Sequence, residues 1–337
     1  MRKNYTILFV VFFTLLAGED FAQSKESKQP SKLLRLYEDD DYFNITGNGT
    51  DESYSSGERL DFFYQKKNNS RFFLNRLMPK AGDSSKNVYG WSLMQIMVTP
   101  SDITVKEYQP NDYAYAGALF AIRSLYSYNP QKKYTLQTEL IAGIRGPASF
   151  AEQVQTGFHN LINSQKPKGW DNQLRTTPLL NINFTAEKQF LSFGNFMEIN
   201  GGTHIGVGSL VDAAVLYPTI RIGKMSPYFD GLLSQFGSYK RNGKTEKTQY
   251  YFIFRPMGSF IAYDALLQGK RENEDDAVQN YKTTTSHIKH FVSDTQFGAV
   301  IAHGNFSVSY TQTYTSEFKK GFYNHSVGNL SLYYKWR

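Results

Sequence analysis

The chain has 337 residues, a formal net charge of +7 and no cysteine, and 16% of its residues are aromatic. The absence of cysteine excludes disulfides and thiolate metal sites. The basic balance does not point to nucleic acid in a chain that begins like an exported protein, and it would suit either anionic lipopolysaccharide or an ordinary solvated surface.

The N-terminus carries the three zones of a secretory signal peptide. Arg2 and Lys3 precede an apolar run over residues 7–17, and Ala22 stands before Gln23. We therefore expect residues 1–22 to be a signal peptide. Residues 23–337 show no internal repeat and no linker, so a single domain is expected. No later stretch has the roughly 18 apolar residues of a membrane helix.

Many segments alternate apolar and polar residues with period two. In residues 134–144 the apolar set lies on one face and Thr135, Gln137 and Glu139 lie on the other. With 24 Tyr and 26 Phe in an exported chain, this pattern is typical of an outer-membrane barrel. We predict an all-β fold, an antiparallel transmembrane β-barrel of about 12 strands, with a short helical insert. Further candidate strands are residues 57–65, 88–99, 115–128, 179–186, 193–200, 213–222, 226–234, 249–260, 306–314 and 330–336.

A soluble β-sandwich is the alternative fold, because single-strand signals are weak in barrels. The polar segment 270–287 is expected to be an exposed turn or loop.

Four consecutive acids, Glu38 to Asp41, follow the first apolar stretch. Adjacent carboxylates repel one another unless solvent or a cation compensates their charge. The run is therefore either a hydrated turn or half of a site for a hard cation.

Residues 146–173 combine a helix with two turns. Ser149 and Glu152 have capping-box spacing, which predicts a helix that begins near Phe150 and ends before Pro167. Residues 150, 154, 158, 161 and 162 form one apolar face. Gln155 and His159 lie four residues apart on a neighbouring face and could reach one ligand together. The alternative is a surface or packed histidine without chemistry.

These motifs together resemble the lipid A 3-O-deacylase family of outer-membrane enzymes. The resemblance runs in order from about Leu33 to Pro178, and a short match follows at residues 315–318. Its elements are Asp40-Asp41-Tyr42-Phe43, Tyr54-Ser55-Ser56-Gly57, Tyr115-Ala116-Gly117, Gly146-Pro147, Val154-Gln155 to His159, and Gly169-Trp170 to Gln173.

The resemblance implies an active site between the barrel wall and the inserted helix, and calcium-dependent hydrolysis of the 3'-linked acyl chains of lipid A. His159 would be the general base, and Gln155 would orient it or donate to the oxyanion. Asp41, with Asp40, would bind Ca²⁺, and Ser55 would position water or substrate. The implied location is the outer membrane of a Gram-negative bacterium, with lipopolysaccharide as partner and a monomeric state.

The chain departs from the family pattern at two positions. Asp40 stands where the family has Asn, and Gln165 stands where some members have Glu. The hypothesis is that the site keeps its total charge but distributes it differently. The register is also open, since Asp39-Asp40 could be the matching pair.

Two rival functions remain at this point. An outer-membrane phospholipase would use the same ester chemistry, whereas a porin or adhesin would need neither Gln155 nor His159. Basic side chains at Lys66, Lys67, Arg71, Lys166 and Lys168 could contact lipid A phosphates or simply be solvated.

Overall fold

The computed structural model describes residues 31–45, 53–66, 72–241, 244–269 and 288–337. Pro30–Trp336 forms one compact unit. The expected signal peptide and the polar segment 270–287 lie outside the described residues. The expectation of a single domain over residues 23–337 stays a prediction.

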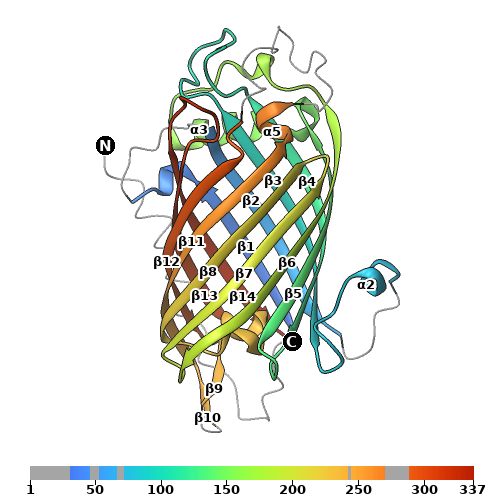
Figure 1. Cartoon of the computed structure of the whole chain (residues 1–337). Helices are drawn as coiled ribbons and strands as arrows, with labels where there is room; N and C mark the ends of the chain where they lie inside the picture. Colours follow the sequence, from blue (N-terminus) through green and yellow to red (C-terminus); the bar gives the residue numbers. More distant parts are fainter. Residues whose placement is uncertain (1–30, 46–52, 67–71, 242–243, 270–287) are drawn as a thin grey trace. The chain divides into compact units, whose positions relative to one another are not determined.

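Twelve antiparallel strands close into a barrel (Figure 1). Their order around the barrel is β1-β14-β13-β12-β11-β8-β7-β6-β5-β4-β3-β2, so nearly every strand pairs with its neighbour in sequence. This confirms the predicted fold class. The strands are β1 (Lys32–Asp40), β2 (Ser53–Gln65), β3 (Lys86–Thr99), β4 (Ala116–Asn129), β5 (Tyr134–Arg145), β6 (Thr177–Phe193), β7 (Met197–Gly208), β8 (Val211–Lys224), β11 (Thr248–Asp264), β12 (Phe291–His303), β13 (Phe306–Thr315) and β14 (His325–Trp336).

One ion pair shows which residues face the lumen. Arg59 on β2 reaches Glu139 on β5 at 2.7 Å, although β3 and β4 separate these strands in the sheet. They can meet only inside the barrel. Because side chains alternate between the two faces of a strand, the outward residues follow from the register. Leu36 on β1 pairs with Leu60 on β2, which in turn pairs with Leu93 on β3. All three side chains are exposed, as a lipid-facing wall requires.

The structure differs from the predicted strands in four places. Residues 226–234 do not form a strand. The predicted strand 193–200 straddles the turn between β6 and β7. β1 and β12 were not predicted as strands, since acids at the end of β1 and small residues in β12 hide the alternation.

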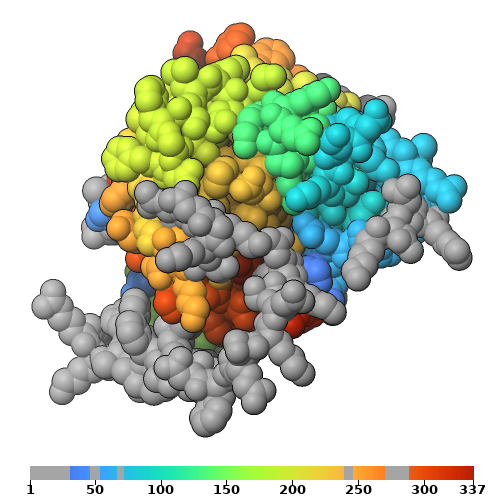
Figure 2. Space-filling model, turned by 90° about the horizontal axis from the view of Figure 1, so that it is seen from below, coloured from blue at the N-terminus to red at the C-terminus, as the bar shows by residue number. Residues whose placement is uncertain are grey.

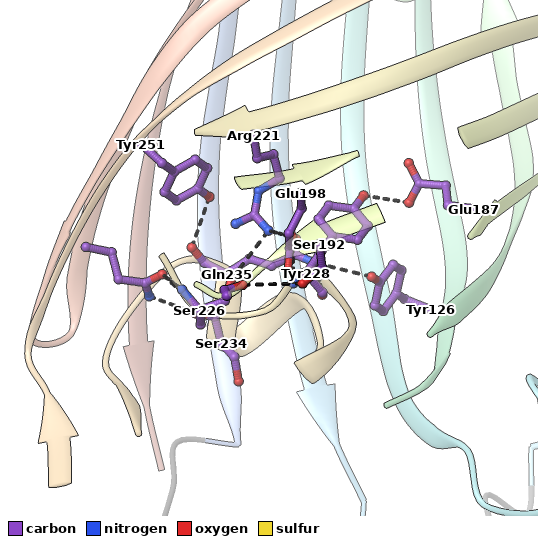
Figure 3. Close-up of polar contacts among 12 residues, drawn as sticks. Tyr126, Glu187, Ser192, Glu198, Arg221, Ser226, Tyr228, Ser234, Gln235 and Tyr251 are labelled. Atoms are coloured by element: carbon purple, nitrogen blue, oxygen red, sulfur yellow. Dashed lines mark hydrogen bonds and ion pairs between the residues drawn. The ribbon is translucent and has the colours of Figure 1, made fainter. Parts of the chain in front are cut away.

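Residues 225–238 form a plug inside one end of the barrel. Their helical turns are η4 (Tyr228–Asp230) and α4 (Leu232–Gln235), and the short β9 (Tyr239–Arg241) and β10 (Lys244–Glu246) hairpin follows. Seen along the barrel, the gold segment lies within the ring of strands (Figure 2). Tyr228 donates to Glu187 of β6 at 2.5 Å and Gln235 donates to the Tyr126 hydroxyl of β4 (Figure 3). The predicted strand is absent because these side chains bond across the lumen.

The other end carries the longest connection between barrel strands, residues 146–176. Residues 100–115 also join strands there, and α3 (Ala151–Ile162) and α5 (Ala265–Gln268) lie at that end (Figure 1). Turns at the plug end are as short as residues 304–305. Outer-membrane barrels have short periplasmic turns and long outer loops, which makes the α3 end the outer one.

The turn between β2 and β3 folds back onto the outside of the barrel. Arg123, which faces outward from β4, is 3% exposed and donates to Asn75 of α2 (Leu74–Leu77) and to the Gly90 carbonyl. Its guanidinium also lies over the Trp91 ring. None of the described helices is long and apolar enough to span a membrane.

Candidate active site

α3 lies against the outside of the barrel wall. Gly117 of β4 pairs with Met97 of β3, which belongs to the outward-facing row. A Cβ at Gly117 would fall 2.2 Å from the Ala151 Cβ, so only glycine lets the helix approach this closely. Gln95 on β3 also donates to the Ser149 carbonyl at 2.6 Å. The start of α3 is thus bound to β3 and β4.

The predicted capping box does not form. A 3-10 turn (Pro147–Ser149) precedes the helix, and Phe150 is the N-cap residue in a left-handed conformation, with no side-chain cap. Ser149 Oγ is buried without a hydrogen-bond partner among the described residues, and Glu152 is exposed. The extra turn moves Ser149 one position too early to accept from the first helical amides.

The buried face of α3 carries the two predicted site residues. Ala151, Gln155 and His159 recur every four residues and are 2%, 5% and 4% exposed. The apolar face predicted from the sequence exists, but it is exposed rather than packed. The helix therefore turns its polar pair, not its apolar stripe, towards the protein.

Both side chains are held by partners that follow α3 in the chain. His159 Nδ1 is hydrogen-bonded to the Gln165 carbonyl oxygen. The Trp170 indole N–H donates to Gln155 Oε1 at 2.8 Å. Trp170 is 1% exposed and packs on the Tyr115 ring, with centroids 4.8 Å apart.

This packing explains two of the sequence motifs. Tyr115 supports Trp170, and the next two residues, Ala116 and Gly117, provide the close contact with α3. Gly169 leaves room for Tyr115, because a Cβ there would lie 2.6 Å from the ring. The Tyr-Ala-Gly and Gly-Trp-x-x-Gln elements are thus two halves of one support for Gln155.

The acid run divides between the two faces of β1. Asp39 faces the lumen and accepts from Tyr37, Tyr54 and Asn329 at 2.5, 3.1 and 2.9 Å. Asp40 faces outward, is 8% exposed, and accepts from the Tyr42 amide at 2.7 Å. Asp41 begins the 3-10 turn η1 (Asp41–Phe43) and is 5% exposed. Of Asp39 and Asp40, only Asp40 is on the side of the wall that carries α3.

Ser55 lies at a bulge near the end of β2. The register of β2 against β3 shifts between Tyr54 and Ser56. Ser55 is 2% exposed, and its hydroxyl donates to the Met97 carbonyl at 3.4 Å. Ser56 faces outward and donates to Glu58 at 3.1 Å. The bulge places both hydroxyl groups at the rim of the wall.

One outward row connects these parts. Asp40 pairs with Ser56, Ser56 with Met97, and Met97 with Gly117 beneath α3. At about 4.8 Å per strand, Ser56 lies about 10 Å from Gly117 and Asp40 about 14 Å from it. The structure thus gathers Asp40, Ser56 and α3 on one side of the barrel wall. Across the described ranges, no three His, Asp or Glu groups gather closely enough to hold a metal ion.

Three contributors were missed in the sequence. Trp170 stood within a quoted motif and Glu58 directly followed another, both without an assigned role, and Gln95 had no signal beyond its place in a strand. Glu58 Oε2 is buried without a hydrogen-bond partner among the described residues.

A family model described as outer membrane protein LpxR matches residues 7–336. The chain belongs to the LpxR family of outer membrane proteins. This is the lipid A 3-O-deacylase family that the sequence motifs resemble.

The fold agrees with this membership. LpxR from Salmonella typhimurium is 17% identical, with a TM-score of 0.70, and the match covers 90% of this chain and 99% of that one. The β domain of the Bordetella autotransporter BrkA is 8% identical with a TM-score of 0.44, covering 92% and 99% of the two chains. The translocator domain of NalP from Neisseria meningitidis is 9% identical with a TM-score of 0.43, covering 98% and 94%. Comparison with curated protein sequences gives no match.

Proposed function

We propose that this LpxR-family protein is an outer-membrane esterase that hydrolyses the 3'-linked acyl chains of lipid A, with His159 as the general base. The observation that carries the proposal is the hydrogen bond between His159 Nδ1 and the Gln165 carbonyl. A carbonyl oxygen can only accept, so Nδ1 carries the proton and the basic lone pair of the neutral ring is on Nε2. His159 is also 4% exposed, on the helix face turned to the barrel wall.

The contact with Trp170 supports a donor role for Gln155. Indole nitrogen is a donor only, so the atom of Gln155 that it meets at 2.8 Å is the amide oxygen. The amide NH₂ group therefore points elsewhere. In the proposed reaction it donates to the oxygen that becomes negative as the ester is attacked.

The proposed reaction is a direct hydrolysis. His159 Nε2 removes a proton from water as the water oxygen bonds to the ester carbonyl carbon. The tetrahedral intermediate then breaks its bond to the 3'-oxygen of the sugar, and the proton returns from His159 to that oxygen. The products are a free fatty acid and a 3'-hydroxyl group, so no other reactant is needed. Ser55 is proposed to position the water, since its hydroxyl oxygen can accept while it donates to Met97.

We further propose Ca²⁺ as cofactor, with Asp41 and Asp40 as its carboxylate ligands. The donor chemistry fits, because Ca²⁺ prefers oxygen and takes part of its shell from backbone carbonyls and water. On the same outward face, two residues along β2 from Ser56, Glu58 Oε2 is a buried carboxylate oxygen without a hydrogen-bond partner among the described residues. When bound, the cation would polarise the ester carbonyl.

The test is a mass spectrum of lipid A from a hexa-acylated Gram-negative host that expresses the chain in the presence of calcium. We expect loss of the 3'-linked acyl mass with the native chain and none with His159→Ala. The exposed His303→Ala at the plug end is the matched control and should behave like the native chain. Unchanged lipid A with lysophospholipid in the same cells would replace the proposal by a phospholipase.

The charge hypothesis has a separate test. Calcium affinity should change in Asp40→Asn and recover in Asp40→Asn/Gln165→Glu, because the second change restores the negative charge near His159. Titration with calcium in detergent measures both. No recovery in the double variant would refute the redistribution of charge.

A further inference from the structure

α3 exposes a continuous apolar stripe. Phe150, Val154, Phe158, Leu161 and Ile162 are 59%, 41%, 41%, 82% and 43% exposed. Five large apolar side chains in one stretch of 13 residues exceed the scattered exposure that is normal on a soluble surface. An exposed apolar stripe of this size is expected to contact other apolar atoms rather than water.

The three faces of α3 follow one another around the helix axis. At roughly 100° per residue, the buried residues Ala151, Gln155 and His159 fill one arc. The exposed polar residues Glu152, Gln153 and Asn160 lie on one side of this arc, and Val154, Phe158 and Leu161 of the apolar stripe lie on the other. Ile162 is the last residue of the helix and is exposed at its C-terminal end. With the buried face against the barrel wall, one flank of the helix is polar and the opposite flank is apolar.

The wall next to α3 indicates what covers the apolar flank. Glu38, Glu58 and Gln95 form the second outward row below the rim. Two residues further along each strand, the outward side chains are Leu36, Leu60 and Leu93, which are 50%, 44% and 53% exposed. The lipid-facing surface of the barrel thus begins directly below the polar rows at the level of α3.

We propose that α3 is an interfacial helix whose apolar stripe contacts the acyl chains of lipids in the outer leaflet. The stripe then continues the leucine belt of the wall, and the polar flank faces water. Amphipathic helices of this kind lie in the plane of the interface with their apolar side in the hydrocarbon boundary. The position of α3 at the end with the long loops places it on the outer side. This inference goes beyond the proposed esterase function and does not depend on it.

The absence of native cysteine gives a direct test, because single cysteines can be spin-labelled without background. Labels would be placed at Phe158→Cys and Leu161→Cys on the stripe, and at Glu152→Cys and Asn160→Cys on the polar flank. Leu93→Cys is the reference for lipid-facing wall. The measurement is the accessibility of each label to oxygen, which concentrates in hydrocarbon, and to a water-soluble nickel chelate, in vesicles that contain lipopolysaccharide.

We expect a high ratio of oxygen to nickel accessibility at positions 158 and 161, as at position 93, and a low ratio at 152 and 160. A low ratio at all four helix positions would overturn the proposal, because the stripe would be in water. Labels at 158 and 161 shielded from both reagents would also overturn it, since a protein partner or a second copy would then cover the stripe. The strand-rich circular dichroism of each variant confirms that the barrel has folded. The labels report the surroundings of the helix and not activity, so the result tests this proposal independently of the esterase proposal.

Discussion

At the residue scale, the site depends on partners that fix each polar group in one orientation. His159 and Gln155 have buried side chains, and each bonds to a residue in the segment after α3, Gln165 and Trp170. A buried polar group held by a hydrogen bond at one end keeps its other end in one orientation, which is the condition for preorganised catalysis. Trp170 is therefore a positioning residue in the proposed reaction.

The first prediction concerns Trp170→Phe. The change removes the N–H that holds Gln155 Oε1, and a neutral hydrogen bond contributes about 1 kcal/mol. We expect kcat for lipid A hydrolysis to fall about fivefold, with KM nearly unchanged, as measured on vesicles. In a Gln155→Ala background the same change should have little further effect. An equal loss in both backgrounds would show that Trp170 does not act through Gln155.

A second prediction concerns Lys319, in the loop between β13 and β14. Its ammonium is 2% exposed, lies over the Tyr113 and Phe322 rings, and has no hydrogen-bond partner among the described residues. Burial lowers the pKa of Lys319 to about 8, although Asp112 and Asp264 oppose this shift. Below that pH the folded chain must hold a buried charge.

The sign of the pH effect follows from proton binding. Between pH 8 and the ordinary lysine pKa of 10.5, the unfolded chain binds more protons than the folded one, so the contribution of Lys319 to stability rises with pH. Lys319→Met should therefore raise the melting temperature most at neutral pH and less at pH 10. Thermal unfolding in detergent at both values measures this. A stabilisation that does not change with pH would contradict it.

At the element scale, α3 is placed by tertiary contacts rather than by a cap of its own. The helix has no side-chain N-cap, and its first turn is held by Gln95 and by close packing on Gly117. A missing cap costs about 1 kcal/mol, and contacts with β3 and β4 replace it. The position of the helix, and so of His159, depends on the space above Gly117.

The third prediction is that Gly117→Ala lowers the activity and that Ala151→Gly in the same chain restores part of it. Gly117→Ala adds a Cβ that would meet the Ala151 Cβ at 2.2 Å, so α3 must shift, and a shift of about 1 Å at a catalytic group costs on the order of a hundredfold in rate. Ala151→Gly removes the opposing carbon. The double variant should recover part of the activity, as followed by lipid A mass spectrometry. A double variant no better than Gly117→Ala would rule out this contact as the cause.

At the scale of the whole molecule, the barrel is filled at the plug end. Arg221 and Glu198 form an ion pair at 2.8 Å next to the plug. Phe236 of the plug stacks on Tyr333 of β14, with ring centroids 4.0 Å apart. Leu233 packs in a cluster with Leu33, Phe63 and Val88. The plug thus contacts strands all around the barrel, which disfavours the porin alternative.

The fourth prediction follows from the plug. The native protein should show no stable conductance in planar bilayers. Replacing residues 227–236 by a Gly-Ser linker of equal length should open a conducting path, because no side chains remain to bond across the lumen. The same linker chemistry at the short turn 194–196 is the control and should leave the barrel closed. Equal conductance in native and linker proteins would show that the plug does not seal the barrel.

The sequence by itself determined the fold class and predicted where the candidate site lies. Period-two alternation survives in β5, β13 and β14 because lipid and lumen impose opposite demands on successive residues. The ordered motifs from Asp40 to Gln173 identified the helix with Gln155 and His159. These are local patterns, and local patterns can be read from one chain.

Only the tertiary structure decided how the parts combine. Alternation separates Asp39 from Asp40, but barrel closure decides which of them faces α3. The segment 226–234 alternates like a strand, yet its side chains are used to bond across the lumen. In a protein surrounded only by water, the apolar stripe on α3 would be interpreted as a face packed against the protein core. A pattern of apolar residues records only that water is excluded, and the arrangement of the barrel in its membrane decides whether protein or lipid excludes it.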